Sequence, residues 1–232
     1  GSPIGIWFGR PSGSTRMPKP TRREGENGMK AGCATSLADD FMLAVYLDGQ
    51  GRVPSYRTGL DFGLSGAMLM ELALDGLIHT AGGHIVAVHA AQSRDRVLGE
   101  VLVRIQSSRT LRTAPQWVRA LSGGAHKRLA AGLITDGVLV RTPRRLPLPA
   151  DSARRYDVLC GERQGAAVRS LRSGADDRSV ALATLATACA VASGDQDESE
   201  YGARMRSLGP ACAEILAAVA ACVWPVALCS WA

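Results

Sequence analysis

The segment from Thr58 to Asp75 constrains the fold of this 232-residue chain more than any other. Large apolar side chains recur there at helical spacing, at Leu60, Leu64, Met68, Leu69 and Leu72. This spacing places them on one face of a helix. Gly76 follows directly, and glycine is a typical residue just past a helix end. The pattern therefore predicts a helix over residues 58–75 whose apolar face packs on a core.

Further helices are predicted on both sides of this segment. Ser36 and Asp39 stand three residues apart, as in a capping box, which indicates a short helical turn. Thr113 followed by Pro115 is typical of a helix start. The other expected helices cover residues 94–106, 113–122, 125–135, 161–173, 176–192, 197–208 and 211–224.

Three short β-hairpins are expected between these helices, because apolar runs there flank turn residues. The first joins residues 42–47 to 52–56 and the second joins 77–80 to 84–89. The third joins residues 138–142 to 146–148. The predicted fold is mainly α, a single helical domain over residues 36–232 with several small β-hairpins.

The two ends of the chain carry separate expectations. Residues 1–35 are rich in Gly, Pro, Ser and charge without periodicity, which favours a disordered tail with no signal peptide. Residues 211–232 contain a single charged side chain, Glu214, but Pro225 interrupts the run and Ala and Cys dominate it. We therefore expect a buried terminal helix there and no transmembrane segment.

Chemistry-bearing residues do not group into a familiar catalytic or metal-binding pattern. The six cysteines form no CxxC pair, which favours a reduced, cytoplasmic compartment. The histidines His79, His84 and His89 flank the second hairpin at spacings that put neighbours on opposite faces. The hydrolase and nucleotide-binding motifs GxSxG, HExxH and GxxxxGK[ST] are absent. We expect no metal, no cofactor and no catalytic residue, and the sequence gives no argument for an enzyme.

Basic charge is concentrated in the middle of the chain. The formal net charge is +6, yet residues 104–155 carry eleven basic side chains and two acidic ones. A helix, a Gly-rich turn, a second helix and a basic hairpin are typical of a winged helix, which would place residues 125–135 in a DNA groove. The same charge could meet anionic lipid, or be a solvated surface without a partner.

Several motifs then resemble, in their order, the Golgi phosphoprotein 3-like family over about residues 36–225. They are Leu37-Ala-Asp-Asp40, Asp48-Gly49-Gln-Gly51, the block from Gly63 to Gly76, Trp117 with Leu121-Ser122-Gly123, and Lys127-Arg128-Leu129 leading to Asp136-Gly137-Val-Leu. The excess of Arg over Lys, with many Ala and Gly, indicates a bacterial member. The resemblance implies a mainly α-helical peripheral membrane protein. It implies a basic pocket for phosphatidylinositol 4-phosphate and an apolar hairpin that inserts into the bilayer.

The resemblance also implies site residues. The family's tryptophan falls at Tyr56, and its three arginines fall at Ser65, at or near Gly123, and at His126, so none of the arginines is kept. We expect neighbouring cations to replace them. The predicted lipid headgroup site is Tyr56, Arg57, His126, Lys127 and Arg128, and the predicted membrane-inserting hairpin residues are Ile85, Val86 and Val88.

The function expected from the sequence is binding of anionic or phosphoinositide lipid headgroups by a peripheral protein at the cytoplasmic side of a membrane. Homo-oligomerisation stays open, and nucleic acid is the less favoured partner. Two alternatives remain: a winged-helix-like DNA-binding protein, and a small-molecule-binding or enzymatic protein of a bacterial biosynthetic pathway. Convergence of Tyr56, His126 and Arg128 on one pocket would favour the lipid site.

Overall fold

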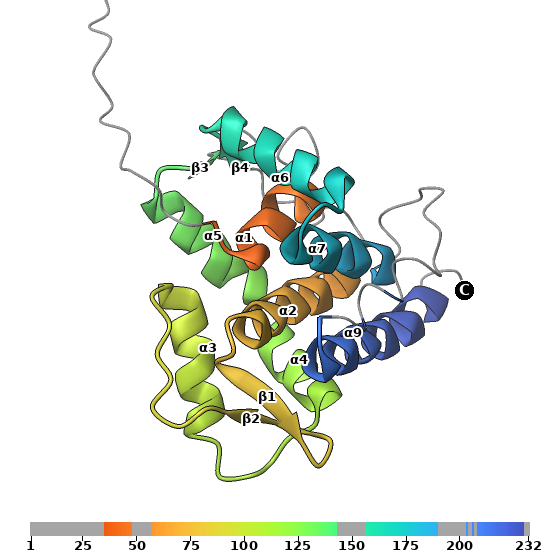
Figure 1. Cartoon of the computed structure of the whole chain (residues 1–232). Coiled ribbons are helices and arrows are strands. Elements are labelled where there is room, and N and C mark those ends of the chain that lie inside the picture. Colours follow the sequence, from red (N-terminus) through yellow and green to blue (C-terminus); the bar gives the residue numbers. More distant parts are fainter. Residues whose placement is uncertain are drawn as a thin grey trace, which may run out of the picture. The chain divides into compact units, whose positions relative to one another are not determined.

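The long helix α2 (Arg57–Leu74) lies at the centre of the computed structural model, with other helices around it (Figure 1). The structure describes residues 35–47, 57–142, 156–189, 203, 206 and 208–229, without the side chains of 57, 58 and 224–229. The predicted tail up to residue 34 and most of the predicted helix 197–208 lie outside the described residues. So do residues 52–56 and 146–148, to which two of the predicted hairpins were assigned.

The remaining helices and strands follow in chain order. The helices are α1 (Leu37–Phe41), η1 (Met42–Tyr46), α3 (Arg96–Gln106), α4 (Ala114–Ser122), α5 (Ala125–Thr135), α6 (Gly161–Ser173), α7 (Asp177–Ala188) and α9 (Pro210–Cys229). The strands are β1 (Ile78–Ala81), β2 (His84–Ala87), β3 (Leu139–Arg141) and β4 (Tyr156–Val158). Together they confirm the expected mainly α-helical fold with small β-hairpins.

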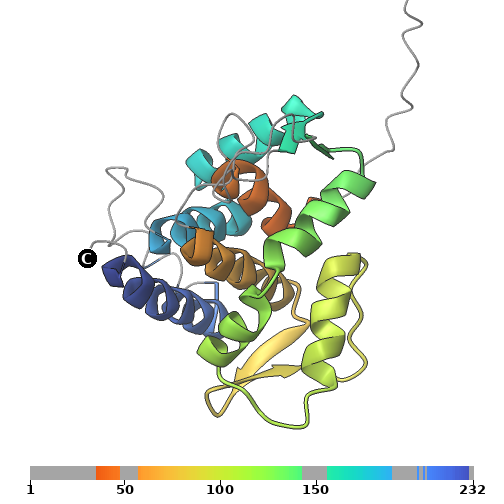
Figure 2. The ribbon, with the colours of Figure 1, turned by 180° about the vertical axis from the view of Figure 1, so that it is seen from behind.

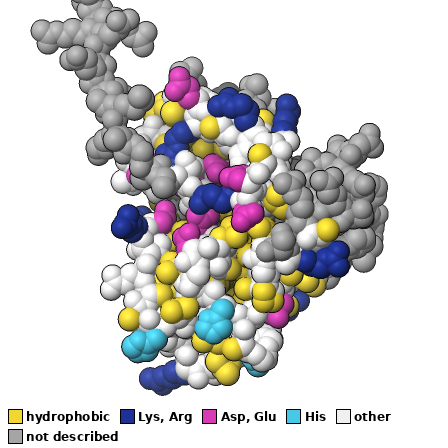
Figure 3. Space-filling view, in the orientation of Figure 1, with side chains coloured by type: hydrophobic (Ala, Val, Ile, Leu, Met, Phe, Trp, Pro, Cys, Tyr) yellow, Lys and Arg dark blue, Asp and Glu magenta, His cyan; other side chains and the backbone are white. Residues whose placement is uncertain are grey.

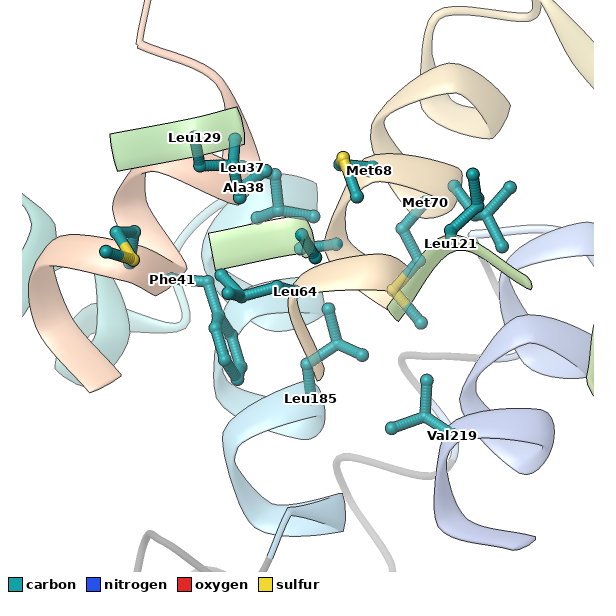
Figure 4. Close-up of a cluster of buried hydrophobic side chains, with 14 of the residues drawn as sticks. Leu37, Ala38, Phe41, Leu64, Met68, Met70, Leu121, Leu129, Leu185 and Val219 are labelled. Carbon is teal, nitrogen blue, oxygen red and sulfur yellow. The ribbon is translucent and has the colours of Figure 1, made fainter. Parts of the chain in front are cut away.

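Helix α2 is buried on nearly every side. Leu60, Leu64, Met68 and Leu69 are completely buried, and so is Met70 on another face of the helix. Helices α1, α7 and α9 pack against α2 on one side, and α4 and α5 cover its back (Figure 2). Figure 4 shows side chains from α1, α2, α4, α5, α7 and α9 meeting in one cluster. The predicted helix 58–75 is therefore confirmed, as the core element around which the others assemble.

Two glycines allow α2 to approach its neighbours closely. A Cβ added at Gly63 would lie 2.5 Å from Phe41 Cζ and 2.6 Å from Cys189 Sγ. A Cβ added at Gly66 would lie 2.4 Å from Val219 Cγ2, which belongs to α9. Because real Cβ contacts are not this short, both positions require glycine for the observed helix spacing.

The expectation of a strand at residues 42–47 is wrong. The stretch Met42–Tyr46 continues α1 as one turn of π-helix, η1. Most of its side chains are buried, so the sequence of this turn is apolar throughout and shows no helical period. A short apolar sequence of this kind does not distinguish a strand from a helix. The Nε2 group of Gln164 in α6 donates a hydrogen bond to the Leu43 backbone carbonyl at 3.2 Å, so a side chain from another helix bonds to the backbone of this turn.

The other two hairpins differ in outcome. The second is confirmed, since β1 and β2 pair antiparallel with Ile78 opposite Ala87. In the third, β3 pairs with β4, with Leu139 opposite Val158, so the expected pairing with residues 146–148 is wrong. Pro147 and Pro149 have no N–H to donate to a strand ladder, and Tyr156 of β4 is an aromatic residue buried in the core.

Helix α9 packs against α2 and α4 and buries an apolar face that includes Cys212, Ile215, Val219 and Val223. This confirms a buried helix near the C-terminus, but it continues through Pro225 to Cys229 instead of ending near residue 224. Within the described part of the chain, no helix has both the length and the apolar composition to cross a membrane.

A buried acid joins the first helix to the core. Glu71 of α2 accepts a hydrogen bond from the Leu37 backbone N–H at 2.8 Å, and pairs with Arg178 of α7 at 2.5 Å. Arg178 also donates to the Thr35 carbonyl. Burial raises the pKa of the Glu71 carboxyl, whereas Arg178 lowers it. The ion pair thus holds the start of α1 against α2 and α7.

Replacing Gly66 by Ala tests the close packing of α2. Alanine normally stabilises a helix relative to glycine by roughly 1 kcal/mol. Here we expect Gly66→Ala to lower the free energy of unfolding by about 1–3 kcal/mol, because its Cβ overlaps Val219. Gly99→Ala in α3 is the matched control, since its Cβ meets only the Ser93 carbonyl at 3.8 Å. Urea denaturation measures both, and equal effects would contradict the packing.

Asp40 gives a pH-dependent prediction. Burial raises the pKa of its carboxyl from 3.8 to about 6, and Arg178 partly opposes this. Between pH 3.8 and about 6, Asp40 is protonated in the folded state but ionised in the unfolded chain. The contribution of Asp40 to the free energy of unfolding therefore falls as the pH rises through this range, and it is constant above about pH 6. We expect Asp40→Asn to be more stable than the parent at pH 7 and to lose this part of the pH dependence. Urea denaturation across this range measures it, and an Asn variant that gains more at low pH would contradict it.

Candidate functional site

Three of the five predicted headgroup residues, His126, Lys127 and Arg128, have described side chains, and these three face different surroundings. Tyr56 lies outside the described residues, and only the backbone of Arg57 is described. The other three begin α5 after Gly124, which has a left-handed backbone with φ of 79°. His126 is buried, Lys127 is exposed and Arg128 is half-buried, so three consecutive residues have three different environments.

His126 belongs to a buried polar cluster. Its Nδ1 lies 3.1 Å from Asp61 Oδ1, and the Tyr46 hydroxyl donates to the same oxygen at 3.2 Å. The rings of Tyr46 and His126 are stacked with centroids 5.7 Å apart. His126 is 3% exposed, and its Nε2 is buried without a hydrogen-bond partner in the described structure. An imidazole held inward beside a carboxylate is poorly placed to bind a lipid phosphate.

Arg128 is engaged with the protein. Its guanidinium donates to the Leu121 carbonyl at 2.6 Å and to the Gly123 carbonyl at 3.1 Å. These carbonyls end α4, where cations are favoured by the helix dipole. Burial lowers the pKa of Arg128, and the nearby Arg104 lowers it further. Arg128 therefore caps a helix in this structure.

The predicted hairpin residues also separate. Ile85 is buried, and its backbone N–H donates to the Arg112 carbonyl at 3.0 Å, which ties β2 to the segment before α4. Val86 is half-buried, and Val88, just after β2, is 39% exposed. Of these three side chains, Val88 is the one that presents a large apolar surface to solvent.

An open groove of about 860 Å³ lies beside this hairpin, and we call it the apolar groove. Its walls come from β2, the following residues 88–93, one side of α3 and the segment 108–111, with Trp117 of α4 also lining it. Three large apolar residues of its lining are exposed, namely Val88, Val103 at 61% and Leu111 at 69%. We call the surface formed by these three and the exposed Arg109, which stands between the lining residues Ser108 and Thr110, the amphiphilic face.

A smaller hollow of about 440 Å³ adjoins the groove, and we call it the basic pocket. It is lined by Thr110, Leu111, Arg112, Gln116 and Arg119, and it shares Thr110 and Leu111 with the apolar groove. The Arg112 guanidinium lies over the Trp117 ring, 5.0 Å from its centroid, in a cation–π arrangement. Figure 3 shows hydrophobic, histidine and basic side chains gathered at this end of the molecule.

The sequence carries a signal for this surface outside its motifs. Val103 stands between Glu100 and Arg104 on the polar side of an otherwise regular amphipathic helix. Leu111 is an isolated large apolar residue between Thr110 and Arg112. Apolar residues on exposed positions of polar segments mark contact surfaces when they gather, and only the fold brings these two together with Val88.

Other chemistry is not favoured by the described residues. They contain no group of three or more His, Cys, Asp or Glu side chains that could hold a metal ion. Helix α5, the recognition helix of the DNA-binding alternative, buries one face and carries two cations, of which Arg128 caps α4. Burial raises the pKa of the Cys189 thiol to about 12 and that of Cys212 to about 11, so these thiols stay protonated and unreactive at neutral pH.

The described residues form a mainly helical domain that carries the amphiphilic face on its surface. Comparison with family models gives a match to Golgi phosphoprotein 3 (GPP34) over residues 37–223. The match covers most of the chain, and the chain belongs to this family. A comparison with curated protein sequences gave no significant match.

Replacing Arg128 separates capping from ligand binding. Because its guanidinium bonds the last carbonyls of α4, we expect Arg128→Ala to lower the free energy of unfolding by about 1–2 kcal/mol. The neighbouring Lys127→Ala removes an exposed cation and is the matched control, with an effect within about 0.5 kcal/mol. Urea denaturation measures both. If the two variants are equally stable, Arg128 does not cap the helix.

Proposed function

We propose that this protein is a peripheral membrane protein that binds anionic lipid surfaces through its amphiphilic face. The observation that carries the proposal is the gathering of Val88, Val103 and Leu111 on one groove, with the exposed Arg109 between two of the lining residues. Exposed apolar patches bordered by polar residues are typical of interaction surfaces. Membership of the Golgi phosphoprotein 3 family is compatible with lipid binding and supports this choice of partner.

The two kinds of side chain contribute different terms to binding. Basic residues near an anionic leaflet contribute roughly 1 kcal/mol each and depend on ionic strength. Apolar side chains that enter the interface contribute about 25 cal/mol per Å² of surface removed from water, with little dependence on salt. A surface with both is expected to bind anionic vesicles well and neutral vesicles weakly. The headgroup class we propose carries a phosphate, as in phosphatidylinositol 4-phosphate, and the membrane is met from the cytoplasmic side.

The hairpin takes part differently from the sequence expectation. Ile85 stabilises the fold from inside, while Val88 and the half-buried Val86 supply the hairpin's share of the face. Among the predicted headgroup residues whose side chains the structure describes, Lys127 is the exposed one. We propose that it adds long-range attraction, and that the insertion itself takes place at Leu111 and Val103.

Vesicle co-sedimentation tests the proposal. The full chain is mixed with phosphatidylcholine vesicles and with vesicles that also contain an anionic phospholipid. We expect Leu111→Asp to weaken binding to anionic vesicles at least tenfold, because it removes an inserted side chain and adds repulsion. Leu159→Asp is the matched control, since Leu159 follows β4, is 62% exposed and does not line the groove.

Charge is tested in the same assay. Arg109→Glu should weaken binding and reduce its salt dependence, while Arg172→Glu on α6 should have a small effect. Equal recovery with neutral and anionic vesicles, or equal losses in Leu111→Asp and Leu159→Asp, would overturn the proposal. Loss of binding in Lys127→Glu with no effect of Leu111→Asp would place the membrane contact at the start of α5.

A further inference from the structure

We propose that the apolar groove binds one acyl chain of an anionic phospholipid and that the basic pocket binds the phosphate of the same lipid. This inference rests on the proposed function, because the membrane that meets the amphiphilic face supplies the lipid. The proposed function requires only contact between this face and a membrane surface, whereas here a single lipid molecule occupies two subsites.

The groove has the size and lining that an acyl chain needs. Its volume of about 860 Å³ falls within the roughly 300–1,000 Å³ typical of small-molecule sites. Buried apolar side chains such as Leu102, Ile105 and Ile85 form its floor, and Val103 and Leu111 extend its walls into solvent. A chain lying here would cover apolar surface that is now exposed to water.

The charged side chains that line the two hollows are all positive among the described residues. Neither the groove nor the basic pocket has an Asp or Glu among its described lining residues, whereas Arg112 and Arg119 line the pocket. Two guanidinium groups can bind phosphate oxygens through paired, charge-assisted hydrogen bonds. This complementarity selects an anionic amphiphile over a neutral one.

Trp117 connects the two subsites. Trp117 lines the groove, and the guanidinium of Arg112, which lines the basic pocket, lies over its ring. Thr110 and Leu111 line both hollows, so the apolar and basic surfaces are continuous. A ligand with a chain in the groove therefore has its head beside the arginines.

The indole of Trp117 adds an independent observation. Trp117 is 1% exposed, and its Nε1 is a buried donor with no hydrogen-bond partner in the described structure. Buried polar groups in proteins are nearly always paired, so an unpaired donor on a side chain that lines a cavity needs an explanation. An ester or phosphate oxygen of a bound lipid is an acceptor of the kind that this donor lacks.

Dodecyl phosphate below its critical micelle concentration is the probe, because it has one chain and one phosphate and forms no bilayer. Isothermal titration calorimetry with the full chain should give one site per chain. Dodecyl maltoside has the same chain with a neutral head and should bind at least tenfold more weakly. Inorganic phosphate alone should bind at least tenfold more weakly too, because it leaves the groove empty.

Filling the groove from within tests the location. Gly99 lines it, and a Cβ there meets only the Ser93 carbonyl at 3.8 Å. Gly99→Phe should weaken dodecyl phosphate binding at least tenfold. Gly161→Phe on α6, where an added Cβ has nothing within 4 Å and which lines neither hollow, is the matched control and should bind as the parent does. Arg119→Gln should remove most of the preference for phosphate over maltoside.

A second readout does not depend on the folding of the Phe variant. In a chain with Trp7, Trp224 and Trp231 replaced by Phe, 12-bromododecyl phosphate should quench the fluorescence of Trp117, while unbrominated dodecyl phosphate should not. Normal vesicle binding without dodecyl phosphate binding or quenching overturns this inference and leaves the proposed function standing. Dodecyl phosphate binding without vesicle binding overturns the proposed function alone. Equal binding of phosphate and maltoside amphiphiles overturns the headgroup subsite.

Discussion

The close approach of α1, α7 and α9 to α2 at Gly63 and Gly66 is the constraint on which the rest of the structure depends. With no Cβ at these positions, Phe41, Leu185 and Val219 reach the backbone of α2, and its side chains fill the space to every neighbour. Because other helices already cover most of α2, the short hairpins and α3 lie at the edges of the fold. The amphiphilic face is therefore built at the periphery, on elements such as α3 that pack in the core with their other side.

Much of the helical architecture could be predicted from the sequence, because periodicity and caps are local signals. Ser36 and Asp39 form the capping box that their spacing indicates, and Thr113, the expected helix start, precedes α4 with Pro115 in its first turn. Two errors came from interactions that are not local. Residues 42–46 are helical because the core surrounds them, and β3 pairs with residues 156–158, ten residues farther along the chain than the predicted partner.

The candidate site was harder to predict for a related reason. Residue identity placed His126, Lys127 and Arg128 together, but a helix turns by about 100° at each residue, so neighbours in sequence face different ways. His126 faces Asp61 inside, Arg128 returns to the end of α4, and Lys127 faces solvent. The groove residues Val88, Val103 and Leu111 are far apart in sequence, and each alone is an ordinary exposed apolar residue. Their common location is a property of the fold.

Hydrogen–deuterium exchange of the full chain, with and without anionic phospholipid vesicles, tests the central claim most directly, because it locates the membrane contact without a substitution. The account predicts slower exchange on vesicle binding in residues 88–93 and 107–112, which border the apolar groove. It predicts unchanged exchange in residues 156–173, which include Leu159. Protection confined to residues 123–128, or to the hairpin of β3 and β4, would contradict the account.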